Sequence, residues 1–534
     1  MAEPYDRQRP QAVAVNRPGV STPARLGYAG ATRWFLLAAM VSLLAADLAV
    51  STLDPWAELG RLLAGILQPD MVAVAGTSVV LTVAFAVLGV ALGAVAGLLL
   101  ALVFARFSAV RALAAALRSV HELFWALLLI QVTGISPTTG ILAIAIPYAG
   151  IFAKVFAELI EEASLAADRV LPIGTDSVSR FAYARLPELA GPFGTYLLYR
   201  LECGMRSTLV LGFIGLPTMG FELESFFRQG RYAEAAAFVA VFYLLIGTRR
   251  IWVRPVTLPF LLAGSVLALA WLTEPIAGDS MWRNLARFLG QDIVPRPLRG
   301  AELAELATWG RFLGWLWPIL ENQALPGLIN TLVLSQIALV ASGILALLLF
   351  PLVCRSFAGL VGRPVGRVLL VMLRSTPEYM LAYLLLQTLG PSMLPAAIAL
   401  ALHNGGIIGY LLGHHADALP YRADAPRGLN LYFYEAVPRL YGQFLAYALY
   451  RWEIIVRESA IFGILGVMTL GYHIDAAITE LRLDTAVVLI VVTALLSIGI
   501  DALSRGLRRR LRIEDRPVRL SADAAKAGSG RACA

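Results

Sequence analysis

The sequence predicts an all-α polytopic membrane protein with about twelve transmembrane helices in two parallel six-helix repeats. Of its 534 residues, 58% are hydrophobic and only 15% are charged, whereas soluble proteins carry about 25% charged residues. Uncharged apolar runs such as 79–104 and 485–500 approach the roughly 20 residues that a bilayer-spanning helix needs. In addition, two stretches about 250 residues apart are similar in sequence. These observations argue against a soluble enzyme.

The expected spans begin after a polar, arginine-bearing leader at residues 1–33. This leader is long for a cleavable signal, so we interpret the first hydrophobic segment as a retained anchor. The twelve hydrophobic segments lie near residues 34–50, 73–104, 119–133, 140–157, 200–216, 234–248, 256–273, 328–353, 368–389, 393–412, 453–470 and 485–503.

The distribution of arginines predicts the orientation in the membrane. Two of the 44 basic residues are lysines, so 42 are arginines. About 31 of them fall in the leader, the tail and alternate loops, and about nine fall in the other loops. An excess of positive charge marks the cytoplasmic side. We therefore expect a multi-pass protein of the bacterial inner membrane with both termini in the cytoplasm, including a basic tail at 505–534. The tryptophan-bearing segment 274–327 is then external and suits the membrane interface.

An internal repeat organises the chain. Residues 187–223 and 438–474 align without a gap, and about 14 of the 37 positions are identical. The identities include arginines and glutamates at fixed spacing, which two unrelated apolar helices would rarely share. We therefore predict a first repeat at 34–252 and a second repeat at 253–504. Because each repeat contains six spans, both enter the membrane in the same orientation, and a transported substrate would pass between them.

Charged residues recur within the expected spans of both repeats. A charge at mid-bilayer costs about 2.5–3.5 kcal/mol, so such residues normally face the bundle interior or water. Glu202 and Arg206 lie i,i+4 on one helix, as do Glu453 and Arg457, and this spacing allows each pair to form an ion pair. Two interpretations remain open: the arginines donate to an oxyanion along its path, or each pair locks its helix in the bundle. The residues concerned are Arg200, Glu202, Arg206, Arg451, Glu453 and Arg457.

A second charged motif begins the third span of each repeat. In the first repeat it reads Arg118-Ser-Val-His-Glu122, and it aligns with Arg374-Ser-Thr-Pro-Glu378 in the second. Carboxylates are favourable at helix N-termini, so we expect Glu122 and Glu378 to cap these helices. A role in gating is the alternative.

The chain carries no pattern for catalysis or for binding a cofactor. A P-loop needs a lysine directly after its second glycine, but Lys154 and Lys526 both follow alanines. The neighbours His414, His415 and Asp417 have no further ligand at a diagnostic spacing, so we interpret them as a solvated loop rather than a metal site. The net charge of +8 is accounted for by membrane orientation and does not predict nucleic-acid binding. We expect no catalytic residue, cofactor or metal.

One loop on the expected cytoplasmic side reads Asp168-Arg-Val-Leu-Pro-Ile-Gly174 and is followed by Ala184-Arg-Leu-Pro187. It resembles the coupling loop of ABC importer permeases, in which a short helix seats in a groove of a separate ATPase subunit. In the second repeat the distance from Gly428 to Pro438 is ten residues rather than 13. The resemblance implies coupling through Asp168, Val170, Leu171, Gly174, Leu186, Pro187, Gly428 and Pro438.

Three further motifs resemble the phosphonate ABC transporter permease family. They read Phe152-Ala-Lys-Val-Phe-Ala-Glu-Leu-Ile-Glu-Glu162, Tyr196-Leu-Leu-Tyr-Arg-Leu-Glu-x3-Arg206 and Leu211-Gly-Phe-Ile-Gly-x4-Gly-Phe-Glu-Leu223. The second repeat carries counterparts of them in Leu400-Ala-Leu-His403, Tyr447-Ala-Leu-Tyr-Arg-Trp-Glu-x3-Arg457 and Phe462-Gly-Ile-Leu-Gly466.

The resemblance implies a type I ABC importer permease with two permease units fused in one chain. Such a subunit is not itself an enzyme. It would translocate phosphonate, phosphite or phosphate with the help of two ATP-binding cassette ATPase subunits and an extracytoplasmic solute-binding protein. The alternative is a twelve-helix secondary transporter driven by an ion gradient, which has no need for the loop around Gly174.

Overall fold

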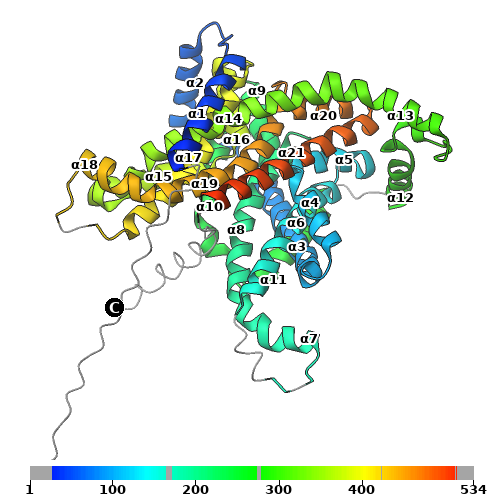
Figure 1. Cartoon of the computed structure of the whole chain (residues 1–534), viewed down its shortest axis with the longest axis horizontal. Helices are drawn as coiled ribbons and strands as arrows, with labels where there is room; N and C mark the ends of the chain where they lie inside the picture. The colour runs from blue at the N-terminus through cyan, green and yellow to red at the C-terminus, as the bar shows by residue number, and fades with distance from the viewer. Residues whose placement is uncertain are drawn as a thin grey trace, which may run out of the picture.

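The computed structural model describes residues 27–163, 171–172, 174–273, 278–421, 424–511 and 513, and all regular secondary structure within these ranges is helical (Figure 1). The all-α prediction is confirmed. The helices up to residue 252 are α1 (Tyr28–Ala45), α2 (Pro55–Leu67), α3 (Gly76–Phe104), α4 (Ser108–Ser119), α5 (Glu122–Thr133), α6 (Pro137–Glu162), α7 (Ser177–Arg180), α8 (Leu186–Gly212), α9 (Met219–Arg228) and α10 (Tyr232–Trp252). The later helices are α11 (Leu258–Leu272), α12 (Gly278–Arg287), α13 (Leu306–Ile319), α14 (Leu325–Leu349), α15 (Arg355–Ser375), α16 (Glu378–Leu389), α17 (Met393–Ala418), α18 (Leu429–Leu431), α19 (Val437–Ser459), α20 (Leu470–Thr479) and α21 (Leu483–Arg510).

Eight helices of the described residues are long and apolar enough to cross a membrane, or nine if the bent pair α4 and α5 counts as one span. The chain is therefore a multi-pass membrane protein. All twelve predicted segments fall on helices, but they are not twelve uniform spans. The segments 119–133 and 368–389 end in the half-length helices α5 and α16, and α11 has only 15 residues. Helices α8 and α19 are long, but they carry arginines and glutamates that lower their hydropathy.

One helix is longer than any bilayer. α13 continues into α14 and the following turn as one apolar stretch of 48 residues, Leu306–Val353, which spans about 72 Å at 1.5 Å per residue. The hydrocarbon core is about 30 Å thick, so α13 must extend beyond it, and Figure 1 shows α13 projecting from the helical body together with α12. This projecting part carries the tryptophans of the segment predicted to be external.

The two stretches of similar sequence fold into the same series of elements. Helices α3 to α10 are repeated in order by α14 to α21. A five-residue π-helical segment, η3 (Phe181–Arg185), precedes α8, and another, η8 (Tyr432–Ala436), precedes α19 at positions 251 residues later (432 − 181 = 251). Because π-helical segments are rare in proteins, their recurrence at one aligned position supports a structural repeat.

Glycines hold the same tight turn in both series. Gly215 and Gly466 have φ values of +89° and +88°, which favour glycine. A Cβ atom added at Gly212 would lie 2.1 Å from the backbone nitrogen of Phe221, and one added at Gly463 would lie 2.0 Å from that of Tyr472. Only glycine therefore allows α8 to approach α9 so closely, and the same holds where α19 approaches α20.

Two helices pack against the opposite half of the molecule. α1 packs on α14 and α19, whereas α11, which precedes the second series, packs on α3. Thr32 Oγ1 lies 2.7 Å from the hydroxyl of Tyr441, and the ring of Phe35 meets Trp452 edge to face at 5.1 Å. This crossing ties the two halves together on both flanks.

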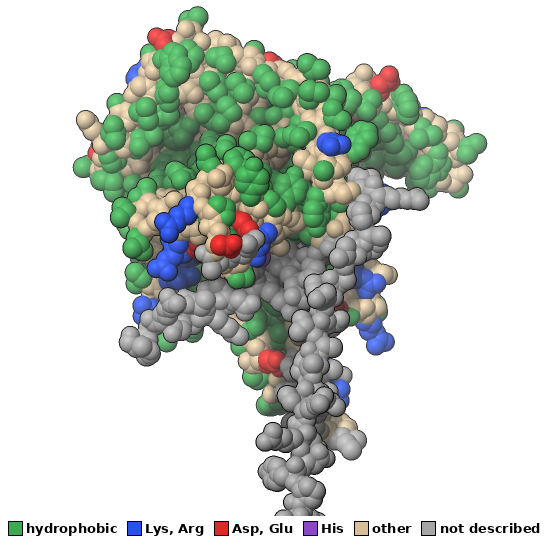
Figure 2. All heavy atoms as spheres, turned by 60° about the vertical axis from the view of Figure 1, so that its left-hand side comes forward, with side chains coloured by type: hydrophobic (Ala, Val, Ile, Leu, Met, Phe, Trp, Pro, Cys, Tyr) green, Lys and Arg blue, Asp and Glu red, His purple; other side chains and the backbone are tan. Residues whose placement is uncertain are grey.

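The surface is that of a protein in contact with lipid. Figure 2 shows hydrophobic side chains covering most of the upper face, with lysines and arginines gathered below them. Leu99, Leu348 and Leu495 each expose more than 60% of their surface. Contiguous apolar surface of this extent is not stable in water, so these helices face the bilayer.

We predict that Gly212→Ala destabilises the protein, because the added methyl group meets backbone that cannot move aside. Overpacking of this kind costs about 1–3 kcal/mol. The matched control is Gly247→Ala, since Gly247 has no atom within 4 Å of an added Cβ. The melting temperature of the detergent-solubilised protein should fall for Gly212→Ala and stay the same or rise for Gly247→Ala. Equal melting temperatures would contradict the close approach.

Candidate functional site

A broken helix lies at the centre of each half. α4 and α5 meet at an angle of 92°, with Arg118 in the last turn of α4 and Glu122 as the first residue of α5. In the second half α15 ends after Arg374, and α16 begins at Glu378. Both glutamates are the first residues of their helices, but the side chain that caps α5 is His121, whose Nδ1 accepts a hydrogen bond from the backbone N–H of Leu123 at 3.2 Å, and α16 has no side-chain cap. Pro377 accounts for the second break, because the residue before a proline is disfavoured in helical conformation.

Each break is bound by an arginine from the other half. Arg206 of α8 donates through Nη1 to the carbonyl oxygen of Arg374 at 3.4 Å. In the same way, Arg457 of α19 donates through Nη1 to the carbonyl oxygen of Arg118 at 2.7 Å. The last carbonyls of a helix have no intrahelical partner and carry a partial negative charge, so a cation is favourable there. The two contacts are reciprocal and join the halves.

The glutamates of α8 and α19 also reach across to the other half. Glu453 Oε1 lies 3.5 Å from Nη1 of Arg118, and Glu202 Oε1 lies 4.0 Å from Nη2 of Arg374. Each network has one further member, which for Glu202 is Arg249 of the same half and for Arg118 is Asp501 of the opposite half. Arg249 Nη2 lies 2.8 Å from Glu202 Oε2, and Asp501 Oδ2 accepts from Arg118 Nη2 at 3.1 Å.

The i,i+4 pairing predicted from spacing is therefore wrong. The ion pairs of the described residues do not join Glu202 to Arg206 or Glu453 to Arg457. The arginines turn to helix-end carbonyls instead, because these lack hydrogen bonds of their own. The glutamates then pair with the arginines at the ends of the broken helices.

The two helix-starting glutamates have different surroundings. Glu122 Oε1 accepts a hydrogen bond from Ser207 Oγ at 2.8 Å, and the neighbouring His121 places Nε2 3.7 Å from Glu122 Oε2. Glu378 Oε2 lies 3.8 Å from Nε2 of His403, which belongs to α17. Both glutamates thus have a histidine close by, but it is the residue before α5 in the first half and a residue of α17 in the second.

Besides its approach to Glu378, His403 makes two contacts that fix it at the interface. Its Nδ1 lies 2.8 Å from the carbonyl oxygen of Thr376, and its Nε2 lies 3.0 Å from Nη1 of Arg206. Among the described residues, Glu378, His403 and Glu458 bring ligand atoms to within 4.8 Å of one another, close enough to hold a metal ion. The positions beside them are taken by Arg206 and Arg451, so the arrangement is that of a charge-balanced network.

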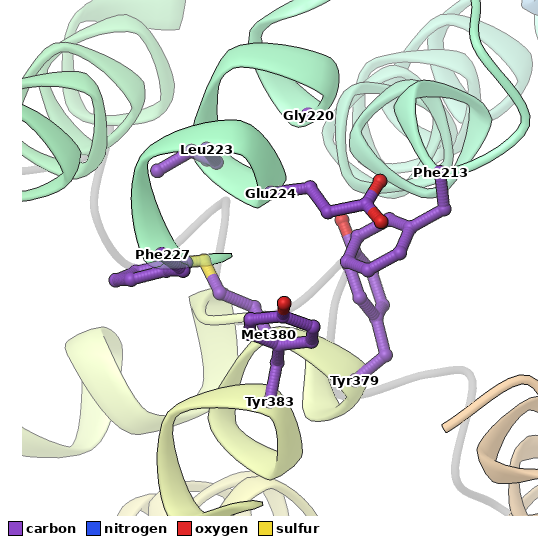
Figure 3. Close-up of a pocket in the computed structure, with 8 residues that line it drawn as sticks. All are labelled: Phe213, Gly220, Leu223, Glu224, Phe227, Tyr379, Met380 and Tyr383. Atoms are coloured by element: carbon purple, nitrogen blue, oxygen red, sulfur yellow. The ribbon is translucent and has the colours of Figure 1, made fainter. Parts of the chain in front are cut away.

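An apolar layer lies next to the charged layer. Leu123 and Tyr379 directly follow the two glutamates and line a small cavity between the halves with Val210, Phe213, Ile461, Ile464 and Leu465. A neighbouring small cavity lies between α9 and α16, and Figure 3 shows Glu224 and Tyr379 reaching into it beside Phe213. The rings of Phe213 and Tyr379 meet edge to face at 5.1 Å. Both cavities are small and lined mainly by apolar side chains packed between the halves.

The predicted coupling residues are only partly described. Asp168 and Val170 lie outside the described residues, whereas Leu171 and Gly174 precede α7 in the chain. Figure 1 shows α7 at the lower end of the helical body. Gly174 has a φ of +99°, as expected for a tight turn. Hydrogen bonds from the side chain and backbone of Ser179 hold the pKa of the Asp176 carboxyl, at the start of α7, below its usual value.

The remaining members of this set begin helices or turn the chain. Leu186 and Pro187 begin α8, and Pro438 occupies the first turn of α19. Gly428 has a φ of +65° and precedes α18.

Sequence reasoning missed Asn404 and Glu458 of the central network, and it named His403 only as the end of a family motif without a role in this network. His403 stands where the first half has Pro147, and Glu458 stands where it has Ser207. A search of the repeat for positions that differ in charge would have found them, whereas a search for identities overlooks them.

Similarity to a known protein extends over most of the chain. The chain is 27% identical over 469 residues to the phosphate-import permease protein PhnE of Mycolicibacterium smegmatis, which covers 82% of this chain and 85% of that protein. It is 32% identical over 176 residues to the phosphite transport system permease protein PtxC of Stutzerimonas stutzeri, covering 31% of this chain and 63% of that protein. A putative phosphite transport system permease of the same organism, HtxE, is 32% identical over 144 residues. No protein-family model matches the chain, and no solved structure matches it significantly.

The fold and the central charged layer define a polytopic membrane protein in which two series of helices meet at this layer. The relatives narrow the class: the chain is similar to permeases of phosphate and phosphite import systems. The predicted resemblance to this family is confirmed.

We predict that Arg118 and Glu453, which form an ion pair between the halves, are energetically coupled. In a double-mutant cycle with Arg118→Gln and Glu453→Gln, the coupling free energy should be about 1–3 kcal/mol, because both side chains are more than 80% buried. The control cycle uses Arg231 and Glu234, whose exposed pair should couple by less than about 0.5 kcal/mol. Thermal unfolding in detergent measures both cycles, and equal coupling in the two would refute the role of the central pair.

Proposed function

We propose that the chain is the transmembrane subunit of an ABC importer that translocates phosphonate-like oxyanions, namely phosphonate, phosphite or phosphate, across the bacterial inner membrane. The observation that carries the proposal is the similarity to the phosphate-import permease, which extends over 82% of this chain. The two phosphite permeases, each matched over part of the chain, support the same class of substrate.

The central layer suits the transport of an anion. Arginine forms planar, two-pronged hydrogen bonds with phosphoryl oxygens, and Arg206 and Arg457 occupy equivalent positions where the halves meet. Glu202 and Glu453 hold the arginines at the ends of the broken helices. In this proposal the cross-half pairs set the distance between the halves, and the broken helices α5 and α16 move when the passage opens.

The proposed assembly includes partners that supply energy and substrate. Two ATPase subunits bind the loops before α8 and α19, and they hydrolyse the ATP, so that this chain is not catalytic. A solute-binding protein delivers the anion on the opposite side of the membrane. The arginine-rich loops, and with them both termini, face the cytoplasm.

We further propose that the chain consists of two fused permease units, at residues 34–252 and 253–504. The recurrence of eight helices, of a π-helical segment and of two glycine turns in the same order supports this division. The segment 274–327 then lies outside the membrane, as an external part of the second unit.

Uptake by the reconstituted complex tests the function. The purified chain, combined in proteoliposomes with its ATPase and binding protein, should import phosphonate, phosphite or phosphate only when ATP is present inside. Sulfate is the control anion and should not be imported. Failure of any ATPase subunit to associate, or uptake that depends on an ion gradient alone, would favour a secondary transporter instead.

The two coupling loops are tested with glycine variants. Gly174→Ala and Gly428→Ala place a side chain on left-handed backbone with no atom within 4 Å, so only backbone strain changes. This strain costs about 1–2 kcal/mol, and substrate-stimulated ATP hydrolysis should fall about fivefold or more in each variant. Gly191→Ala, in the helical part of α8, is the control. Unchanged stimulation in one variant would show that its loop does not couple.

A further inference from the structure

Two arginines at the same place in the repeat have different partners. Arg451 of α19 donates through Nε to Asn404 Oδ1 at 2.6 Å and through Nη2 to Glu458 Oε1 at 3.4 Å. Asn404 also donates through Nδ2 to Glu458 Oε2 at 3.2 Å. The positive charge of Arg451 is therefore neutralised by a carboxylate, and this triad is complete in itself.

Arg200 of α8, 251 residues earlier, lies among tyrosine rings instead. Its guanidinium carbon is 5.8 Å from the ring centre of Tyr148, 5.3 Å from that of Tyr196 and 5.6 Å from that of Tyr199. Its Nε donates to the hydroxyl of Tyr196 at 2.9 Å. Within the described parts of the chain this is its only hydrogen bond, and it forms no ion pair there.

The difference follows from two positions of the repeat. Where the second half has Asn404 and Glu458, the first half has Tyr148 and Ser207. The hydroxyl of Ser207 is used by Glu122 and brings no negative charge. Tyr148 supplies one of the aromatic faces around Arg200. Arg200 therefore has aromatic partners where Arg451 has a carboxylate partner.

An unpaired arginine within a membrane protein requires a reason. Tyrosine faces attract a cation by about 0.5–2 kcal/mol, which is less than the loss of a buried ion pair. Arginine has five N–H donors, and Arg200 uses the one on Nε for Tyr196. The N–H donors of both Nη groups therefore stay available, while the tyrosine rings hold the guanidinium plane. An oxyanion provides both the missing charge and acceptors for these donors.

We propose that Arg200, held by Tyr148, Tyr196 and Tyr199, binds the transported oxyanion, and that the second half has no equivalent site. This inference rests on the proposed function. Arg200 precedes Arg206 by six residues and so lies about 9 Å nearer the α7 end of α8. In the proposed orientation this is the cytoplasmic side. The anion then meets Arg200 after passing the central layer, and the route is asymmetric although the fold is repeated.

The test is uptake of radiolabelled phosphate, phosphite and methylphosphonate by the full reconstituted complex. Arg200→Gln should lower kcat/KM for uptake about tenfold. The control is Arg231→Gln combined with Glu234→Gln, which removes both charges of an ion pair outside the central layer and should keep uptake within about twofold of the unaltered complex. If the control falls as far as Arg200→Gln, or if Arg200→Gln keeps uptake within twofold, the asymmetric site is refuted.

Melting temperatures provide a readout that a merely structural arginine would not give. Removing an uncompensated charge should leave the melting temperature of Arg200→Gln unchanged or raise it, whereas removing a structural arginine should lower it. Phosphate should raise the melting temperature of the unaltered complex and not that of Arg200→Gln. A phosphate-dependent shift that persists in Arg200→Gln would overturn the proposal.

The failure of the inference can be told apart from the failure of the proposed function. If the unaltered complex takes up none of the three anions, the proposed function is wrong and the inference falls with it. If uptake is normal and only Arg200 proves dispensable, the function stands. Should Arg200→Gln not assemble, Arg200→Lys, which keeps the charge but loses the planar fork, decides the matter: a raised KM supports the site, and an unchanged KM refutes it.

Discussion

The contact between an arginine of one half and the end of the broken helix of the other half is the interaction on which the structure depends. A helix that ends within the membrane leaves carbonyl groups that neither lipid nor its own helix can satisfy. Arg206 and Arg457 satisfy these groups from across the interface. The same arginines carry charge into the bilayer, so they must face the other half. Each half therefore requires the other, and the remaining features can be understood from this requirement.

The charged contacts explain why α8 and α19 are long but less apolar than the other long helices of the repeat. α8 and α19 carry arginines and glutamates because they form the interface, and the surrounding helices α3, α6, α14 and α17 shield them from lipid. Helices α1 and α11 then pack across the boundary and hold the halves in register. The tight glycine turns bring α9 close against α8 and α20 close against α19, and side chains of α9 line a small cavity beside α16.

Joining two halves in one chain lets equivalent positions diverge. In a pair of identical subunits, Arg200 and Arg451 would have the same partners. Here one lies among tyrosines and the other is paired with Glu458. Likewise, the histidine beside the helix-starting glutamate comes from α17 in one half and from the residue before α5 in the other. A repeated fold can thus carry a site in only one of its halves.

Local sequence determined the helices, the membrane class, the repeat and the family resemblance, because hydropathy, glycine turns and identities at fixed spacing depend only on neighbouring residues and on self-comparison. It also placed Glu122 and Glu378 at helix starts. The tertiary structure alone decided the partners of the charges. Spacing indicated that Glu202 and Arg206 share a helix face, but a nearer unsatisfied carbonyl of Arg374, more than 160 residues away in the chain, draws the arginine away. Such competition between local and cross-half partners depends on how the two halves pack, and no periodicity along the chain records it.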